Sequence, residues 1–211
     1  MNTENELKQV AQEVAGCTKC KLYHSRKLAV AGEGPANADI MFIGEGPGFH
    51  ENEQGRPFVG AAGKFLDELL ENIHLKRSQV FITNIVKCRP PGNRDPEQDE
   101  IQACNDYLER QIHAINPKVI VTLGRYSMGK FLPNAKISLI HGQAMHVKGR
   151  LVVAMYHPAA GLHQRSLLSV IQDDFARLPE LLAQAGKMEA LPEETQDEPT
   201  QKGPPKQLSL F

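Results

Sequence analysis

A chain of 211 residues, 41% hydrophobic and 23% charged, fits one globular domain with a sizeable core and excludes collagen-like and coiled-coil architectures. Its formal net charge of −1 gives no sign of a nucleic-acid partner from bulk electrostatics. No apolar run reaches the roughly 18 residues of a membrane span, and the N-terminus lacks the apolar core of a secretory signal, so we expect a cytoplasmic protein without a membrane partner.

The apolar pattern predicts alternating helices and strands. Residues 4–15 are expected to form a short helix, because apolar residues recur there at helical spacing. Buried strands are predicted at residues 38–44, 80–86, 119–124 and 151–156, and helices at residues 65–73, 101–115 and 166–182. The alternation predicts the α/β class: a three-layer α/β/α domain around a mostly parallel, four-stranded sheet.

The composition changes towards the C-terminus. Residues 1–186 are expected to form the folded domain, with a cysteine-containing arm at its N-terminus. Residues 187–206 are rich in Pro and Glu and offer almost nothing to bury, which predicts a disordered acidic linker. Residues 207–211 become apolar again.

The first predicted strand leads into a glycine-rich turn, residues 44–48 (GEGPG). A dinucleotide-binding turn is excluded, because Phe49 stands where the third glycine should be and Pro47 removes an amide. Glu45 would also place negative charge against a phosphate. A glycine-rich turn with a carboxylate suits a flat, uncharged ligand, and a plain strand-to-loop turn explains the same residues equally well.

The four cysteines are too few for a disulfide scaffold in a compartment that keeps thiols reduced. Cys104, taken alone, is explained as a core residue on the apolar face of a predicted helix. Together, Cys17, Cys20, Cys88 and Cys104 predict one tetrathiolate site, for zinc or for an iron–sulfur cluster. Their spacing does not decide between these two.

Polar side chains follow several of the predicted strands. Glu45, Asn84 and His157 lie at carboxyl ends of strands, where open α/β sheets bind their ligands. A carboxylate, an amide and an imidazole can recognise a planar heterocycle and stabilise charge on it. A lone histidine in such a turn is more often structural. The hypothesis of a binding site therefore depends on the position that these three residues share. The sequence shows no pair of metal-binding aspartates, which an enzyme of nucleotidyl transfer would need.

These segments together resemble the family 4 uracil-DNA glycosylases, the iron–sulfur branch of the uracil-DNA glycosylase superfamily. The resemblance rests on GEGPG followed by Glu51, GRPFVGAAG (55–63), TNIVKCRPPGNRDP (83–96), VIVTLG (119–124), YHPAAG (156–161) and family-like cysteine spacing. It covers about residues 17–182. It implies a DNA repair enzyme that flips uracil out of single- or double-stranded DNA and hydrolyses the N-glycosidic bond, leaving an abasic site.

The resemblance implies catalytic roles for three residues. His157 would donate a hydrogen bond to uracil O2 as negative charge grows there, Glu45 would lie near the sugar, and Asn93 would help to place water or the leaving group. A related branch that links covalently to DNA carries an extra basic loop, which this chain lacks between Gly63 and Phe81. We therefore expect turnover.

The resemblance also implies how the base is bound. Phe58 would stack on the uracil, and Asn84 would read its O4 and N3 edge. Glu51 would crowd the C5 position and so reject the methyl group of thymine, while Gly46 would line the pocket near the sugar. The four cysteines would hold a [4Fe-4S] cluster with a structural role.

Contacts with DNA are expected from basic residues and one apolar wedge. The phosphate-binding candidates are Lys87, Arg89 and Arg165, with Lys19, Lys21 and Arg94 as further ones. For any single one of them, ordinary solvated surface is the simpler interpretation. Leu162 is the candidate to fill the space that the flipped base vacates.

The C-terminal peptide resembles the motif by which bacterial repair proteins dock in the sliding clamp. Gln207, Leu208, Leu210 and Phe211 would bind the clamp, and the linker would raise the effective concentration of enzyme at DNA. The sequence offers no self-complementary interface, so we expect a monomer in the cytoplasm, associated with the nucleoid.

Two alternatives to uracil excision stay open. One is a glycosylase for another deaminated or damaged base, since a few pocket residues decide that choice. The other is a non-enzymatic iron–sulfur module that binds DNA, against which the joint presence of Glu45, Phe58, Asn84 and His157 argues.

Overall fold

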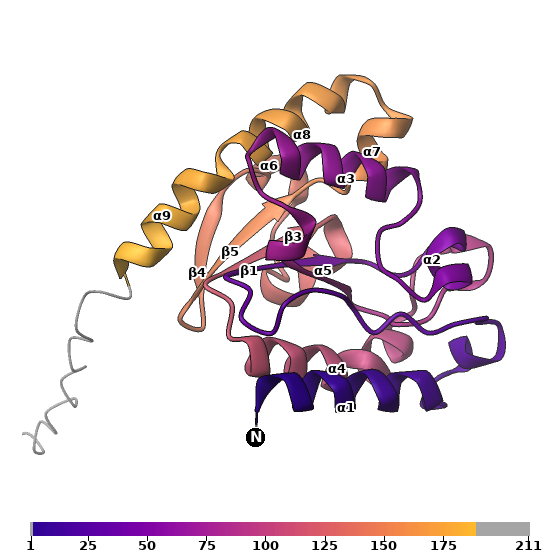
Figure 1. Ribbon diagram of the computed structural model, residues 1–211. Helices are drawn as coiled ribbons and strands as arrows, with labels where there is room; N and C mark the ends of the chain where they lie inside the picture. The colour runs from indigo at the N-terminus through magenta and orange to yellow at the C-terminus, as the bar shows by residue number, and fades with distance from the viewer. Residues whose placement is uncertain (1, 189–211) are drawn as a thin grey trace, which may run out of the picture.

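Figure 1 shows the computed structural model of the chain, which describes residues 2–188. The strands are β1 (Ile40–Gly44), β2 (Phe81–Asn84), β3 (Val119–Leu123), β4 (Ala144–Val147) and β5 (Arg150–Met155). The α-helices are α1 (Thr3–Gly16), α2 (Phe49–Gln54), α3 (Ala61–Asn72), α4 (Gln98–Ile115), α5 (Arg125–Phe131), α6 (Ile137–Ile140), α7 (Pro158–His163), α8 (Ser166–Ala176) and α9 (Leu178–Met188). Short 3₁₀ turns are η1 (Lys21–His24), η2 (Arg77–Gln79) and η3 (Pro91–Asn93).

The sheet has the strand order β2-β1-β3-β5-β4. Strands β2, β1, β3 and β5 run parallel, and β4 pairs antiparallel with β5 at one edge. The predicted α/β class with a mostly parallel sheet is confirmed, but the prediction missed β4. This strand is short and only half buried, so it lacks the apolar run of the others. Its signal was the two-residue turn Lys148–Gly149, in which both residues have positive φ, as a tight hairpin requires.

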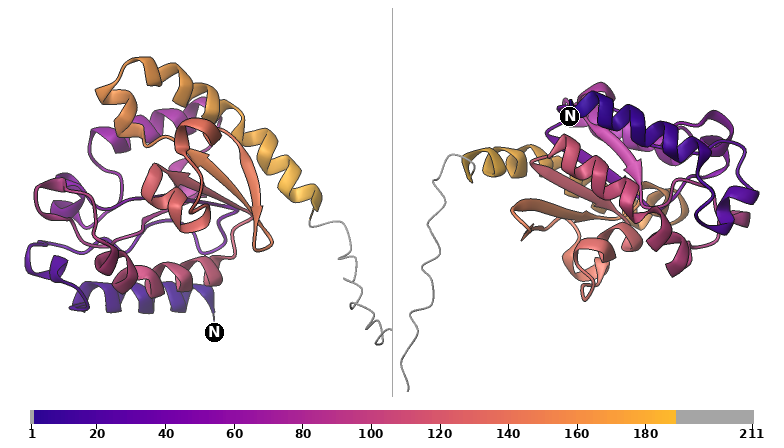
Figure 2. Two further views of the ribbon diagram at one scale, coloured as in Figure 1. Left: turned by 180° about the vertical axis from the view of Figure 1, so that it is seen from behind. Right: turned by 90° about the horizontal axis from the view of Figure 1, so that it is seen from below.

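Helices cover both faces of the sheet (Figures 1 and 2). On one face, α3, α8 and α9 bury their apolar residues against the sheet, with the Phe42 and Phe175 rings stacked 6.0 Å apart. On the other face, α4 forms a second core that includes Cys88 and Cys104. Helix α1 lies outside α4, where Val10 and Val14 contact Tyr107. The three-layer prediction therefore holds, with α1 added as an outer layer.

The single helix predicted for residues 166–182 is wrong, because the chain forms α8 and α9 instead. Pro179 follows the junction at Arg177. Proline has no N–H for the helical ladder and its ring would collide with the carbonyl four residues earlier, so α8 ends and a new helix begins. Helix α9 extends to Met188, so the predicted linker begins inside it.

The rest of the predicted linker and the peptide at residues 207–211 lie outside the described residues. Within residues 2–188, none of the helices combines the length and apolar character that a bilayer-spanning helix needs. The parallel strands all point their carboxyl ends to the same edge of the sheet. There, Gly44 of β1 pairs with Asn84 of β2, and Leu123 of β3 pairs with Met155 of β5.

Candidate functional site

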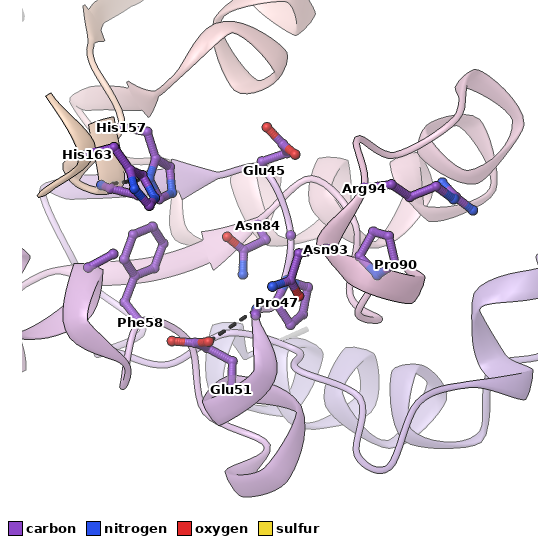
Figure 3. A pocket seen from close by; sticks show the side chains of 14 residues that line it. Glu45, Pro47, Glu51, Phe58, Asn84, Pro90, Asn93, Arg94, His157 and His163 are labelled. Carbon is purple, nitrogen blue, oxygen red and sulfur yellow. Dashed lines mark hydrogen bonds between the residues drawn. The ribbon is translucent and has the colours of Figure 1, made fainter. Parts of the chain in front are cut away.

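A cavity of about 440 Å³ opens at the carboxyl edge of the sheet. It is lined by every residue to which the sequence assigns catalysis or base binding: Glu45, Gly46, Glu51, Phe58, Asn84, Asn93 and His157. Figure 3 shows their side chains around one space, with Phe58 and His157 on one side and Asn84 and Asn93 across from them. The structure thus brings these residues together from the ends of β1, β2 and β5, from α2 and η3, and from the loop before α3.

Asn84 ends strand β2, and its side chain is buried. Its Oδ1 atom has no hydrogen-bond partner in the described part of the chain. A buried amide oxygen without a partner costs free energy, which a donor from a bound ligand would recover. Gly44 makes room for this amide, because a Cβ there would lie 2.4 Å from Oδ1 and 2.8 Å from the Phe58 ring.

Phe58 is held in a strained backbone conformation, with φ of +50°. Arg77 supports this turn, since its guanidinium donates to the carbonyl of Phe58 at 3.2 Å and also to that of Pro57. The same guanidinium pairs with Asp67 at 3.1 Å. Gly63 packs beneath, where a Cβ would lie 2.0 Å from the Phe58 carbonyl oxygen. Sequence reasoning missed Arg77, which no motif marks.

The Glu51 carboxylate is fixed by backbone amides. Oε1 accepts hydrogen bonds from the N–H groups of Val59 (2.8 Å) and Gly60 (2.9 Å), and Oε2 accepts one from Gly48 (3.1 Å). These bonds tie the start of α2 to the loop that carries Phe58. Glu51 therefore positions the cavity wall as well as lining it.

His157 follows β5 and packs beside Phe58, with ring centroids 5.4 Å apart. Its Nδ1 accepts the N–H of Ala159 at 3.1 Å, so the neutral ring carries its proton on Nε2. Burial lowers the pKa of His157 to about 4, against a smaller opposing effect of the Glu51 carboxylate. Near pH 7 the imidazole is thus a neutral hydrogen-bond donor through Nε2.

The Glu45 carboxyl is half buried in the cavity wall. Burial raises its pKa, the Asp95 carboxylate adds to this effect, and Arg125 opposes it. Asn93 lies at the cavity mouth with φ of +54°, and its Oδ1 accepts a hydrogen bond from Arg89 Nε at 2.7 Å. These two residues therefore differ in exposure, with Glu45 inside the cavity and Asn93 at its rim.

Lys87 is wrong as a predicted DNA contact, because its side chain is only 1% exposed. The amine donates to Thr83 Oγ1 (2.6 Å), to the Asn84 carbonyl (2.9 Å) and to Gln111 Oε1 (2.8 Å). Burial lowers the pKa of Lys87 to about 7. Its role in the structure is to brace the end of β2 against α4.

The other predicted DNA contacts are at the surface. Leu162 is 46% exposed on α7, and Arg165 is exposed beside it. Arg89 is half buried and bonds Asn93. Three further candidates already have acidic partners: Lys19 pairs with Asp106, Lys21 with Glu97, and Arg94 with Glu100.

All four cysteines line a second, smaller cavity between η1, the loop after β2 and α4. Arg26 Nη1 donates to Cys88 Sγ at 3.2 Å and to the Cys17 carbonyl at 2.8 Å. Burial raises the pKa of Cys104 to about 11. Among residues 2–188, no group of three or more His, Cys, Asp or Glu side chains converges so as to hold a single metal ion. The thiols thus surround a space without meeting at one point.

Comparison with known proteins agrees with this geometry. The family model of the uracil DNA glycosylase superfamily matches residues 31–178. A type-4 uracil-DNA glycosylase of Sulfurisphaera tokodaii is 49% identical over 187 residues, which cover 84% of this chain and 85% of that protein. One of Saccharolobus solfataricus is 47% identical, covering 85% and 88% of the two chains. One of Thermotoga maritima is 40% identical, covering 88% of this chain and 100% of that protein.

We predict that His157 titrates at a pKa of about 4, against an ordinary value of 6.5. Between these values the unfolded chain binds the proton and the folded chain does not, so this group lowers the free energy of unfolding as the pH falls. NMR titration of ¹³C-labelled histidine measures the pKa, with His157→Gln assigning the signal and a histidine peptide as reference. A midpoint near 6.5 would contradict the buried, neutral ring.

Proposed function

Because this chain belongs to the uracil-DNA glycosylase superfamily, we propose that it is a type-4 enzyme that excises uracil from DNA in base excision repair. The relatives of 40% to 49% identity that carry this name span most of the chain. The observation that carries the proposal is the unpartnered, buried Oδ1 of Asn84 in a cavity walled by the Phe58 ring. An aromatic wall and one amide suit a planar base with adjacent donor and acceptor groups.

Base recognition follows from the amide. Asn84 Oδ1 would accept the N3–H of uracil, and its NH₂ group would donate to O4. Cytosine presents an acceptor at N3 and a donor at C4, so it would leave both pairs unsatisfied inside the cavity. Thymine shares this edge with uracil and differs by the C5 methyl. The Glu51 carboxylate, held by three backbone N–H groups, is the rigid wall that we assign to excluding it.

The reaction breaks the bond between C1′ of the sugar and N1 of uracil, and water supplies the new oxygen on C1′. The bonding electron pair leaves with uracil, and His157 Nε2–H would donate to O2 as charge grows there. A neutral imidazole does this without surrendering a proton. Glu45 would stabilise the positive charge on the sugar, and Asn93 at the rim would help to place water. The attacking water loses one proton to solvent, the uracil anion takes one up from solvent on release, and an abasic site remains.

We predict cleavage at uracil only. An end-labelled oligonucleotide with one deoxyuridine is incubated with the protein and then treated with alkali, which breaks the strand at abasic sites. His157→Ala should slow excision by roughly 10²–10³-fold, the usual cost of removing one donor to a developing anion.

His113→Ala, which changes an exposed histidine of α4, is the matched control. A strand with thymidine should stay intact. No cleavage by protein that binds the strand would favour another lesion or the non-enzymatic module.

We also propose that Cys17, Cys20, Cys88 and Cys104 hold a [4Fe-4S] cluster. The support is their shared cavity and the guanidinium of Arg26 on Cys88. A cluster takes each thiolate on a different iron, whereas zinc needs all four sulfurs at about 2.3 Å from one ion. The cluster would act here as a structural cross-link between segments of the chain and not as an electron carrier, because glycosidic hydrolysis involves no change of oxidation state. It would fix the η1 arm to the loop that carries Arg89 and Asn93.

Elemental analysis should find about four irons and four labile sulfides per chain. Cys88→Ala should lose this iron and lower thermal stability, since metal binding contributes to folding. The Arg26→Lys variant keeps all four thiols and should retain the iron. Stoichiometric zinc without sulfide would contradict the cluster.

The last five residues are proposed to bind a bacterial sliding clamp. Leu210 and Phe211 would enter an apolar groove, and Gln207 and Leu208 would contact its rim. Monomeric enzyme on a tether would then be concentrated at chromosomal DNA in the cytoplasm. This proposal rests on the sequence, since residues 207–211 lie outside the part that the structure describes.

Deleting residues 207–211 should abolish capture of the protein by immobilised clamp and leave excision on short oligonucleotides unchanged. A chain in which the same five residues are scrambled controls for length. Equal clamp binding by full-length and truncated protein would contradict the proposed role of these five residues.

A further inference from the structure

An exposed aromatic residue directly follows a residue that lines the base cavity, and it has none of the roles described so far. Phe49 begins α2 directly after Gly48, which lines the cavity. The Phe49 side chain is 53% exposed. Single exposed apolar residues are common, so any inference about this ring must rest on its contacts with neighbouring residues.

Arg89 covers part of the ring, with its Cζ atom 5.3 Å from the ring centroid. Its Nε donates to Asn93 Oδ1, which ties the guanidinium to the rim of the cavity. This hydrogen-bond partner is an amide, so the positive charge of Arg89 is not neutralised by it. The ring also packs nearly perpendicular to His50, with ring centroids 5.4 Å apart and an interplanar angle of 82°. The ring is therefore held in place while much of it stays exposed.

The ring and Arg89 adjoin two residues of the cavity lining, Gly48 and Asn93. Ala159 and His163 of α7 belong to the same lining, and Figure 3 shows His163 and Asn93 on opposite sides of the cavity. Both α2 and α7 lie at the same end of the molecule (Figure 1). A strand that enters the cavity across Gly48 and Asn93 would bring a neighbouring base and phosphate near Phe49 and Arg89.

We propose that Phe49 and Arg89 form a stacking platform for the base adjacent to the uracil in an unpaired strand. That base would stack on the face of the Phe49 ring, and the guanidinium of Arg89 would contact the phosphate between the base and the uracil nucleotide. Aromatic rings beside a cationic groove bind unpaired bases in this way, with little sequence preference. The platform rests on the proposed function, because it is the flipped uracil that brings the neighbouring base to the rim.

The test measures binding of a single strand that holds one 2′-fluoro-deoxyuridine, whose glycosidic bond resists cleavage. Fluorescence anisotropy compares the complete strand with strands in which the 5′ or the 3′ neighbour is an abasic analogue. For the unmodified protein, Kd should rise about fivefold or more when one of the two neighbouring bases is missing. Phe49→Ala should weaken binding of the complete strand by a similar factor. The Kd of this variant should not change further when the neighbouring base is missing.

Phe49→Trp should restore both the affinity and the response, which separates stacking from general disturbance of α2. Leu139→Ala removes a 70%-exposed side chain of α6 that does not line the cavity, and it should bind like the unmodified protein.

The platform is contradicted if Phe49→Ala binds all three strands as the unmodified protein does, or if it weakens binding but still responds to the missing base. Failure of the proposed function has a different signature. In that case the unmodified protein would release no uracil from a cleavable strand, whatever the Kd values of the variants.

Discussion

The register between β1 and β2 is the constraint on which the base cavity depends. Parallel pairing sets Gly44 beside Asn84, and any side chain at position 44 would collide with the amide and with the Phe58 ring. The same backbone hydrogen bonds that hold the apolar core in place therefore bring these two groups together. A shift by one residue would exchange the two faces of a strand, so the core and the cavity are specified by a single alignment.

The cavity keeps several groups in states that an isolated peptide would avoid. Phe58 has a left-handed backbone, and Asn84 leaves a buried oxygen without a donor. Between pH 4 and 6.5, His157 stays neutral where a free imidazole would be protonated. Each is unfavourable, and at Phe58 the strain is offset by Arg77 and Glu51, which hydrogen-bond the backbone of residues 58 and 59. A ligand with the matching donor and acceptor pattern finds these groups already oriented, so binding needs little reorganisation of the protein.

The sequence predicts the parts of this site that follow from strand ends. Apolar runs locate β1, β2 and β5, and the polar residues directly after them, Glu45, Asn84 and His157, must then share one edge. Supporting residues are harder to foresee. Arg77 lies outside any motif, and Lys87 looks like surface charge until its neighbours are known to bury it. Strand β4 was missed because an edge strand needs no continuous apolar run. The break before α9 was missed because the regular apolar spacing was given more weight than the proline.

Lys87 also lines the cavity of the four cysteines, while its amine holds the carbonyl of Asn84. The two cavities thus share a wall, made by residues 84–88. Insertion or deletion of even one residue there would displace the Cys88 sulfur and the Asn84 amide at once. The exposed turn at residues 148–149 lies at the far edge of the sheet, joined to β4 and β5 alone. A peptide inserted at this turn, as in a reporter fusion, should therefore disturb the two cavities less than one inserted at residues 84–88.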